Sequence, residues 1–118
     1  MYNQRDIVLI PIPFSDLTSN KRRPVVIISN DDYNKRSSGI VVVALTSNLA
    51  FENSYSIDVD DYNLEAGAFP HKSRLRCDKI YTLSKNMVVK KFNTPNNETF
   101  ALIKQKISSL ISDKNESK

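Results

Sequence analysis

The apolar residues of the chain fall into short runs separated by polar stretches, a pattern that predicts six short strands. Residues 25–29 and 40–47 show no alternation of apolar and polar positions, which is typical of strands buried on both faces. Residues 55–59 and 73–83 alternate with a period of two, so each of these strands should have one exposed face. The expected strands are residues 6–10, 25–29, 40–47, 55–59, 73–83 and 88–92.

One long helix is predicted near the C-terminal end. Apolar side chains recur at helical spacing between residues 100 and 111, which indicates an amphipathic helix. Thr94 and Pro95 precede it as the expected N-cap and first helical residue, because proline needs no amide donor at that position. Residues 112–118 are entirely polar and are expected to fray.

The segments between the strands are polar or rich in proline. Residues 11–15 contain two prolines and are expected to form an edge or a turn, and residues 84–87 a brief helical turn. Residues 16–22 and 30–39 are expected to be loops. Several short strands with one terminal helix predict a mainly β fold, a small twisted antiparallel barrel of the SH3-like kind with the helix covering an open end.

The composition fits one globular domain, expected over residues 1–111. The chain has 118 residues and a mass of 13.4 kDa, with 40% hydrophobic and 25% charged residues, close to ordinary globular usage. Its longest apolar runs are far shorter than the roughly 20 residues of a membrane-spanning helix. The first residues lack the pattern of a secretory signal, so we expect a cytoplasmic protein with no membrane partner.

Cysteine and histidine are too few for several kinds of site. Cys77 is the only cysteine and His71 the only histidine, so one chain can form neither a disulfide nor a serine–histidine triad. A cysteine cluster or a two-histidine metal site is excluded for the same reason. Any catalysis must therefore use other groups, and Cys77 is interpreted as a core residue. We expect no metal ion and no cofactor.

Charge is distributed unevenly along the chain. Residues 52–65 hold five acids and no lysine or arginine, whereas residues 72–91 hold seven basic residues and Asp78 alone. The alternation in residues 73–83 places Arg74, Arg76 and Asp78 on one face, which is expected to point outward. This asymmetry favours an anionic partner, although solvated strands and turns also carry such runs by chance.

Arg22 and Arg23 stand directly before Pro24 and the apolar strand that follows. In an extended chain the two arginines point to opposite sides, and Arg23 is the better placed because it adjoins the strand. A guanidinium is always charged and offers a planar fork of donors that suits two phosphate oxygens. The alternative is a surface arginine that pairs with an acid such as Asp16 or Asp78.

Two hydroxyl residues, Thr46 and Ser47, end the strand predicted at residues 40–47. A hydroxyl at such a point either bonds the local backbone or faces a cleft. The sequence leaves both alternatives open.

The order of these segments resembles the PemK/MazF family of endoribonuclease toxins from toxin–antitoxin systems. The resemblance covers about residues 5–111 and ends with the predicted helix. The chain departs from the family pattern at Arg5, where a glycine is common, in the shorter loop before Arg23, and at Lys79, where a glutamine is common. The segments that carry the resemblance are Asp6-Ile7-Val8, Arg23-Pro24-Val25-Val26-Ile27-Ile28-Ser29, Val43-Ala44-Leu45-Thr46-Ser47 and Arg76-Cys77-Asp78-Lys79-Ile80-Tyr81-Thr82-Leu83.

The resemblance implies an SH3-like homodimer that cleaves single-stranded RNA at a short sequence without a metal ion and is blocked by an antitoxin protein. The chemistry of the family falls on Arg23 and on Thr46 or Ser47 here, and the acid of the later strand matches Asp78. Attack by the ribose 2′-hydroxyl would give 2′,3′-cyclic phosphate and 5′-hydroxyl ends. Arg23 would stabilise the phosphate charge and a hydroxyl would hold the same phosphate, while the general base stays unassigned.

Further RNA contacts are expected from basic residues and from aromatic residues in polar loops. Tyr33 or Phe69 would stack an unpaired base, or else anchor its loop onto the core. His71 is either a proton donor or simply solvated. The expected RNA-binding residues are Lys21, Arg22, Tyr33, Lys72, Arg74, Arg76, Asp78 and Lys79.

Two other classes of function compete with the toxin interpretation. A barrel of this kind could bind RNA or a peptide without cutting it, because small barrels host many unrelated functions. A module of the eukaryotic SH3 type would bind proline-rich ligands in an aromatic groove, but the absence of tryptophan disfavours it.

Overall fold

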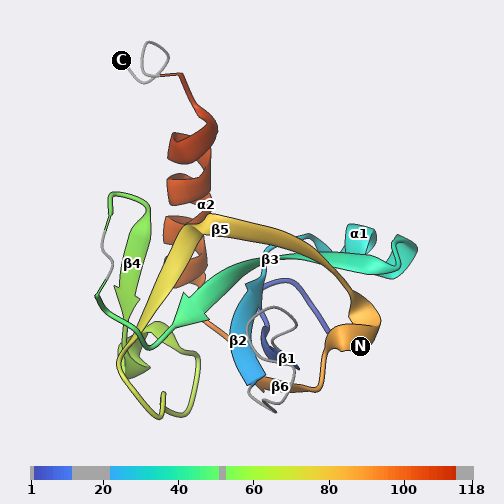
Figure 1. Ribbon diagram of the computed structural model, residues 1–118, viewed down its shortest axis with the longest axis horizontal. Coiled ribbons are helices and arrows are strands. Elements are labelled where there is room, and N and C mark those ends of the chain that lie inside the picture. Colours follow the sequence, from blue (N-terminus) through green and yellow to red (C-terminus); the bar gives the residue numbers. More distant parts are fainter. Residues whose placement is uncertain (1, 12–21, 51–52, 114–118) are drawn as a thin grey trace.

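The computed structural model describes residues 2–11, 22–50 and 53–113, which form one six-stranded antiparallel sheet with a long C-terminal helix (Figure 1). The strand order is β4-β5-β3-β2-β1-β6. All six expected strands are present, with ends that differ by at most three residues from the prediction. The strands are β1 Ile7–Pro11, β2 Arg22–Ile27, β3 Gly39–Thr46, β4 Ser56–Val59, β5 Ser73–Ser84 and β6 Lys90–Asn93.

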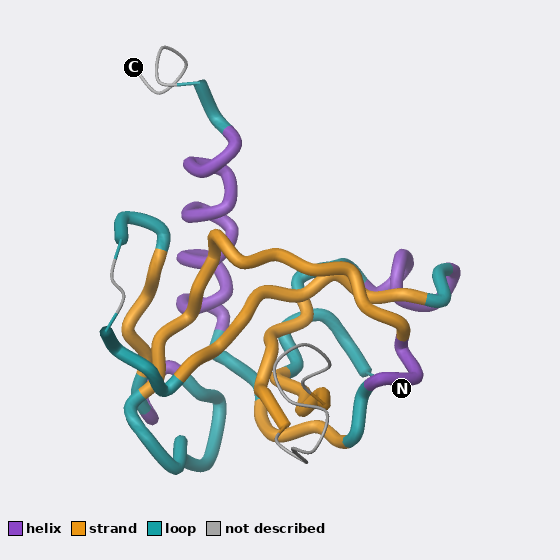
Figure 2. Tube along the Cα trace, in the orientation of Figure 1, coloured by secondary structure: helices purple, strands orange, loops and turns teal. Residues whose placement is uncertain are grey.

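The sheet coils strongly but is not closed, since no pairing joins β4 to β6 among the described residues. The mainly β fold with a C-terminal helix is confirmed, and the molecule is an open form of the small barrel. An isolated bridge between Leu64 and Pro95 links the segment after β4 to the segment after β6. Figure 2 shows the strands curving around one side of the molecule while the helix extends away from them.

A bulge bends β5 in its middle. Val43 of β3 pairs with Ile80 of β5, but the next residue, Ala44, pairs with Arg76, so residues 77–79 have no partner on β3. The amide of Cys77 instead donates to the carbonyl of Tyr55, at 3.2 Å. Cys77 is fully buried, as expected, and burial raises the pKa of its thiol to about 11.

The core lies on both faces of the sheet, because β3 is buried on each side. Val43 and Leu45 belong to a cluster that includes Phe100 of the helix, whereas Ile40 and Val42 belong to a second cluster on the opposite face. β3 lies between β2 and β5, which confirms the central, doubly buried strand expected from its unbroken apolar run.

The helix α2 spans Asn97–Ile111 and packs against β4 and β5. The expected start at Thr94 and Pro95 is wrong by two residues. Asn96 is the N-cap, and its side chain accepts from the amide of Thr99 at 2.9 Å and donates to the carbonyl of Tyr62 at 2.8 Å. Pro95 is held in its bridge to the segment after β4 and is therefore not available to begin the helix.

The loop expected at residues 30–39 is in part a short helix, α1, Asp31–Arg36. Its six residues are too few for a hydrophobic period, so its signals are polar. Asn30 caps the first turn by accepting from the amide of Tyr33, and Arg36 pairs with Asp32 one turn earlier. Neither α1 nor α2 is long and apolar enough to span a membrane, and no other described segment is a longer helix.

Two 3-10 turns and the backbone conformation of Arg5 complete the description. The helical turn expected at residues 84–87 is present as a 3-10 turn, η2, Lys85–Met87, and a second 3-10 turn, η1, is Asp61–Asn63. Arg5 has a positive φ of 81°, a conformation that glycine adopts most easily, so the family's preference for glycine there has a backbone reason. The Arg5 side chain pairs with Glu65 at 3.0 Å.

Candidate active site

The strand register aligns Arg23 with Thr46. Val25 of β2 pairs with Ala44 of β3, and continuing this antiparallel register by two residues places Arg23 beside Thr46. On the next strand Thr46 itself pairs with Arg74 of β5. Residues directly opposite one another in a sheet project to the same face, so the predicted arginine and hydroxyl share one face and one end of the sheet.

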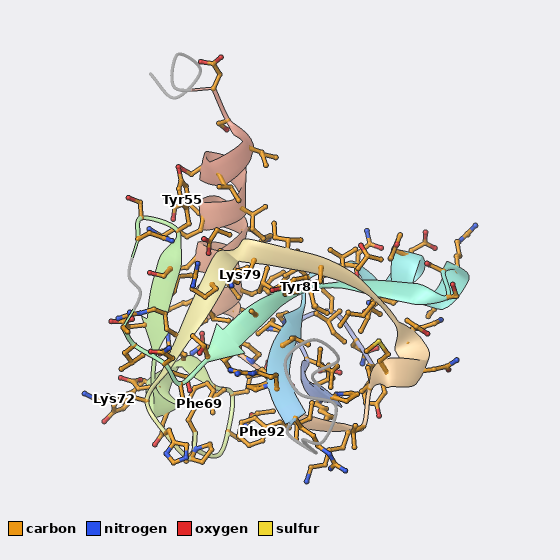
Figure 3. The ribbon with its side chains drawn as sticks, in the orientation of Figure 1. Tyr55, Phe69, Lys72, Lys79, Tyr81 and Phe92 are labelled. Carbon is orange, nitrogen blue, oxygen red and sulfur yellow. The ribbon has the colours of Figure 1, made fainter. Side chains whose placement is uncertain are left out.

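A groove of about 710 Å³ runs along this face. Arg23 and Thr46 lie at the edge where β2 begins and β3 ends, and β5 contributes Arg76, Lys79 and Tyr81. Figure 3 shows Lys79 and Tyr81 on β5, and the Tyr81 side chain is exposed by 42%. The groove therefore combines three cations, a hydroxyl and an accessible aromatic ring, as contact with a charged, ring-containing ligand would require.

The Arg23 side chain is exposed, and no hydrogen bond or ion pair holds it within residues 2–11, 22–50 and 53–113. Two acids were expected as possible partners of Arg23. Asp78 is paired with Arg76 instead, and Asp16 lies outside the described residues. A guanidinium in this position keeps its full donor fork for an external anion.

The structure separates the two hydroxyl candidates. Thr46 is half-buried in the groove, and its Oγ1 accepts the amide of Asn48 at 3.0 Å. That bond uses one lone pair and orients the hydroxyl, whose own hydrogen can still be donated to a ligand. Ser47 is exposed beyond the end of β3 and lines a second cavity rather than the groove. The Thr46 hydroxyl thus both bonds the local backbone and faces the groove, the two alternatives expected for a hydroxyl at a strand end.

Arg76 and Asp78 form a bidentate ion pair within the bulge of β5. Arg76 Nε and Nη2 lie 2.9 Å from the two carboxylate oxygens of Asp78, and Asn53 Nδ2 donates to the same carboxylate at 3.2 Å. The hydrogen bond from Arg76 lowers the pKa of Asp78, and Asp78 in turn raises the pKa of Arg76. Arg76 therefore lines the groove with its positive charge partly offset by Asp78.

The expectation that Arg74 points outward is wrong. Its side chain is only 6% exposed, its Nε bonds Asp58 Oδ1 at 2.5 Å, and its Nη1 donates to the carbonyl of Leu49 at 2.9 Å. These bonds tie β5 to β4 and to the loop after β3. The hydrogen bond from Arg74 lowers the pKa of Asp58.

The other expected RNA contacts are scattered. Arg22 and Lys72 are exposed at the end of the sheet where β2 and β5 begin, and Arg22 lines the second cavity. Tyr33 lies on α1, before the start of β3, and a rise of about 3.3 Å per residue separates the two ends of β3 by about 23 Å. Lys21 lies outside the described residues.

Sequence reasoning missed Tyr81, because a strict period of two puts it on the face opposite Arg76. The three unpaired residues of the bulge shift the phase, so Tyr81 pairs with Val42 and Arg76 with Ala44, two residues apart on one face of β3. No simple sequence signal marks the bulge. In the described part of the chain, no group of three His, Cys, Asp or Glu side chains is arranged to hold a metal ion.

A family model of PemK-like, MazF-like toxins of type II toxin–antitoxin systems matches residues 3–111. The chain belongs to this family. No curated protein matches the sequence.

The fold is similar to that of several solved toxins at low sequence identity. A mycobacterial endoribonuclease in complex with its cognate antitoxin gives a TM-score of 0.71 at 16% identity, covering 92% of this chain and 93% of that one. The Mycobacterium tuberculosis toxin MazF-mt6 gives 0.70 at 16%, covering 89% and 94%. A chain of the MazE-MazF crystal structure from Deinococcus radiodurans gives 0.71 at 16%, covering 93% and 95%.

Proposed function

We propose that this chain is a sequence-specific endoribonuclease toxin that cleaves single-stranded RNA without a metal ion. The proposal rests on one observation above all: Arg23, whose side chain has no partner among the described residues, is aligned with Thr46 at the end of the groove. Membership of the toxin family and the likeness to an endoribonuclease solved with its antitoxin support it.

In the proposed reaction the ribose 2′-hydroxyl attacks the adjacent phosphorus and the 5′-oxygen leaves, giving 2′,3′-cyclic phosphate and 5′-hydroxyl ends. The substrate supplies the nucleophile, so the protein aligns the attack and stabilises charge on the non-bridging oxygens. Arg23 offers two donors to those oxygens, and the Thr46 hydroxyl donates a third hydrogen bond. Arg76 adds positive potential along the groove despite its pair with Asp78.

Three further properties belong to the same proposal. The toxin acts as a homodimer in the cytoplasm, and an antitoxin protein occupies the groove and inhibits it. The MazE-MazF complex from Deinococcus radiodurans is the precedent for such a partner. Light scattering of the purified protein tests the dimer, which requires twice the chain mass of 13.4 kDa.

The decisive experiment incubates the purified protein with a long unstructured RNA in excess EDTA and maps the new ends. Discrete cuts with 5′-hydroxyl ends are expected, and a 2′-deoxy substitution at the cut position should abolish them. Arg23→Ala should lower the rate by about 100-fold or more, and Arg23→Lys should lose most activity because an ammonium lacks the planar fork. Intact RNA at high protein concentration would overturn the nuclease proposal.

The two hydroxyls are compared in the same assay. Thr46→Ala should lower the rate by about 10-fold, because one neutral donor contributes less than a guanidinium. Ser47→Ala is the matched variant, because it removes a hydroxyl from the next residue of the chain. An unchanged rate for Thr46→Ala with a loss for Ser47→Ala would transfer the phosphate contact to Ser47.

A further inference from the structure

A second cavity, of about 470 Å³, opens beside the Arg23 and Thr46 pair. It shares a wall with the groove, since Arg23, Pro24, Leu45 and Thr46 line both spaces. Leu45, Phe69 and Phe92 belong to the core cluster on the face opposite the groove, so the cavity and the groove meet at the end of the sheet where β2 begins and β3 ends. An RNA whose phosphate is held by Arg23 and Thr46 reaches the cavity by passing around this end. The proposed cleavage mechanism assigns the cavity no task.

The inner wall of the cavity is aromatic. Phe69, from the loop before β5, and Phe92, on β6, both line it, with ring centroids 6.2 Å apart and ring planes tilted by 36° (Figure 3). Both rings are half-buried against the core beneath. The Phe69 amide donates to Asp61 Oδ1 at 2.8 Å, which fixes the loop that carries the ring. Phe69 and Phe92 thus form an apolar surface whose position is fixed by core packing and by the Asp61 hydrogen bond.

The rim of the cavity is polar and positively charged. Arg22 and Ser47 are exposed there, and His71 supplies a ring that can accept or donate a hydrogen bond. None of the described residues that line the cavity is acidic. An apolar wall with a cationic, hydrogen-bonding rim complements a flat heterocycle attached to a phosphate better than it complements a purely apolar or an acidic side chain.

We infer that this cavity binds the base of a nucleotide adjoining the phosphate that is cleaved, so that Phe69 and Phe92 provide the stacking surface and His71 contacts the base edge. The inference rests on the proposed endoribonuclease function, because Arg23 and Thr46 must hold the phosphate for the base to reach the cavity. It makes these residues determinants of the sequence at which the RNA is cut.

The test uses short oligonucleotides with a 2′-deoxy nucleotide at the cut position, which bind but cannot be cleaved. Each flanking base is replaced in turn by an abasic site, and affinity is measured by fluorescence anisotropy. For the wild type, one of the two abasic replacements should weaken binding by about 10-fold, within the range for loss of a stacked base. For Phe69→Leu, the same replacement should have little effect, because the stacking surface has been removed already.

Phe69→Leu is chosen because it keeps apolar packing against the core, and circular dichroism checks that the variant is folded. Tyr62→Ala is the matched control, since Tyr62 is aromatic, 91% exposed and not part of either cavity wall. In Tyr62→Ala the abasic replacement should weaken binding as much as it does in the wild type. His71→Ala should relax the preferred base at that position while keeping the 5′-hydroxyl ends of the products.

The outcomes separate this inference from the proposed function. Suppose that the wild type cuts RNA and that the abasic replacement weakens binding equally in the wild type and in Phe69→Leu. This result overturns the base-binding role and leaves the cavity to another ligand, such as a side chain of the antitoxin. A wild type that cuts no RNA overturns the proposed function. It overturns this inference as well, because no cut position is then defined beside which a base could be bound.

Discussion

Three arginines lie in or beside the groove, and their partners decide which of them an RNA phosphate can reach. Arg74 is buried and bonded to Asp58, Arg76 shares a bidentate pair with Asp78, and Arg23 is unpaired within the described residues. Their side chains have the same chemistry, so the difference arises from their positions in the sheet. At the residue scale the candidate site is therefore centred on Arg23.

The Arg76–Asp78 pair predicts a specific pH dependence. The folded-state pKa of Asp78 is lowered, so the pair stabilises the fold above the ordinary carboxyl pKa near 4, and this contribution is lost as the pH falls through the lowered value. Asp78→Asn should lower the free energy of unfolding at pH 7 by about 0.5 to 1 kcal/mol, with a decreasing difference from wild type below about pH 4. Urea denaturation across pH measures it.

The matched control is Asp32→Asn, which removes the acid of the exposed Arg36–Asp32 pair on α1. Its effect at pH 7 should be smaller, because both side chains are more than 70% exposed and solvent screens them. A difference for Asp78→Asn that persists unchanged at pH 2 would show that the carboxylate charge is not the source of the stabilisation.

At the scale of elements, strands with a strong apolar pattern were predictable and elements defined by polar contacts were not. The buried run of β3 and the amphipathic pattern of α2 placed both elements to within two residues. The six-residue α1 was missed because capping and one ion pair define it. The bulge of β5 depends on pairing with strands distant in sequence, so no local pattern could reveal that Tyr81 shares a face with Arg76.

The N-cap of α2 is an element-scale prediction. Asn96→Ala removes the acceptor for the Thr99 amide and the donor to the Tyr62 carbonyl, so it should lower the free energy of unfolding by about 1 to 2 kcal/mol. Thermal or urea denaturation measures the change. Ser109→Ala, an exposed position within α2, is the control and should be neutral or slightly stabilising. Equal stability for Asn96→Ala and wild type would refute the assigned cap.

At the scale of the whole molecule, the positive charge is modest in total but unevenly placed. The net charge of +4 would give only weak general attraction for RNA. Arg22, Arg23 and Lys72 nevertheless gather at the end of the sheet where β2 and β5 begin. β4 ends there as well, since Val59 pairs with Ser73, and the acids of η1 and its N-cap follow directly. A polyanion is therefore attracted by these basic side chains locally, and not by a charge difference between two ends of the molecule.

This local group of basic side chains predicts how RNA affinity responds to salt. Each phosphate neutralised on a single strand contributes about 0.7 to the slope of log affinity against log salt, because condensed counterions are released. Arg22→Ala and Lys72→Ala should each reduce the slope measured with an uncleavable oligonucleotide by about 0.7. Lys35→Ala, on α1 at the far end of β3, should leave the slope unchanged. Equal slopes for all three variants would mean that RNA does not follow the charged end of the sheet.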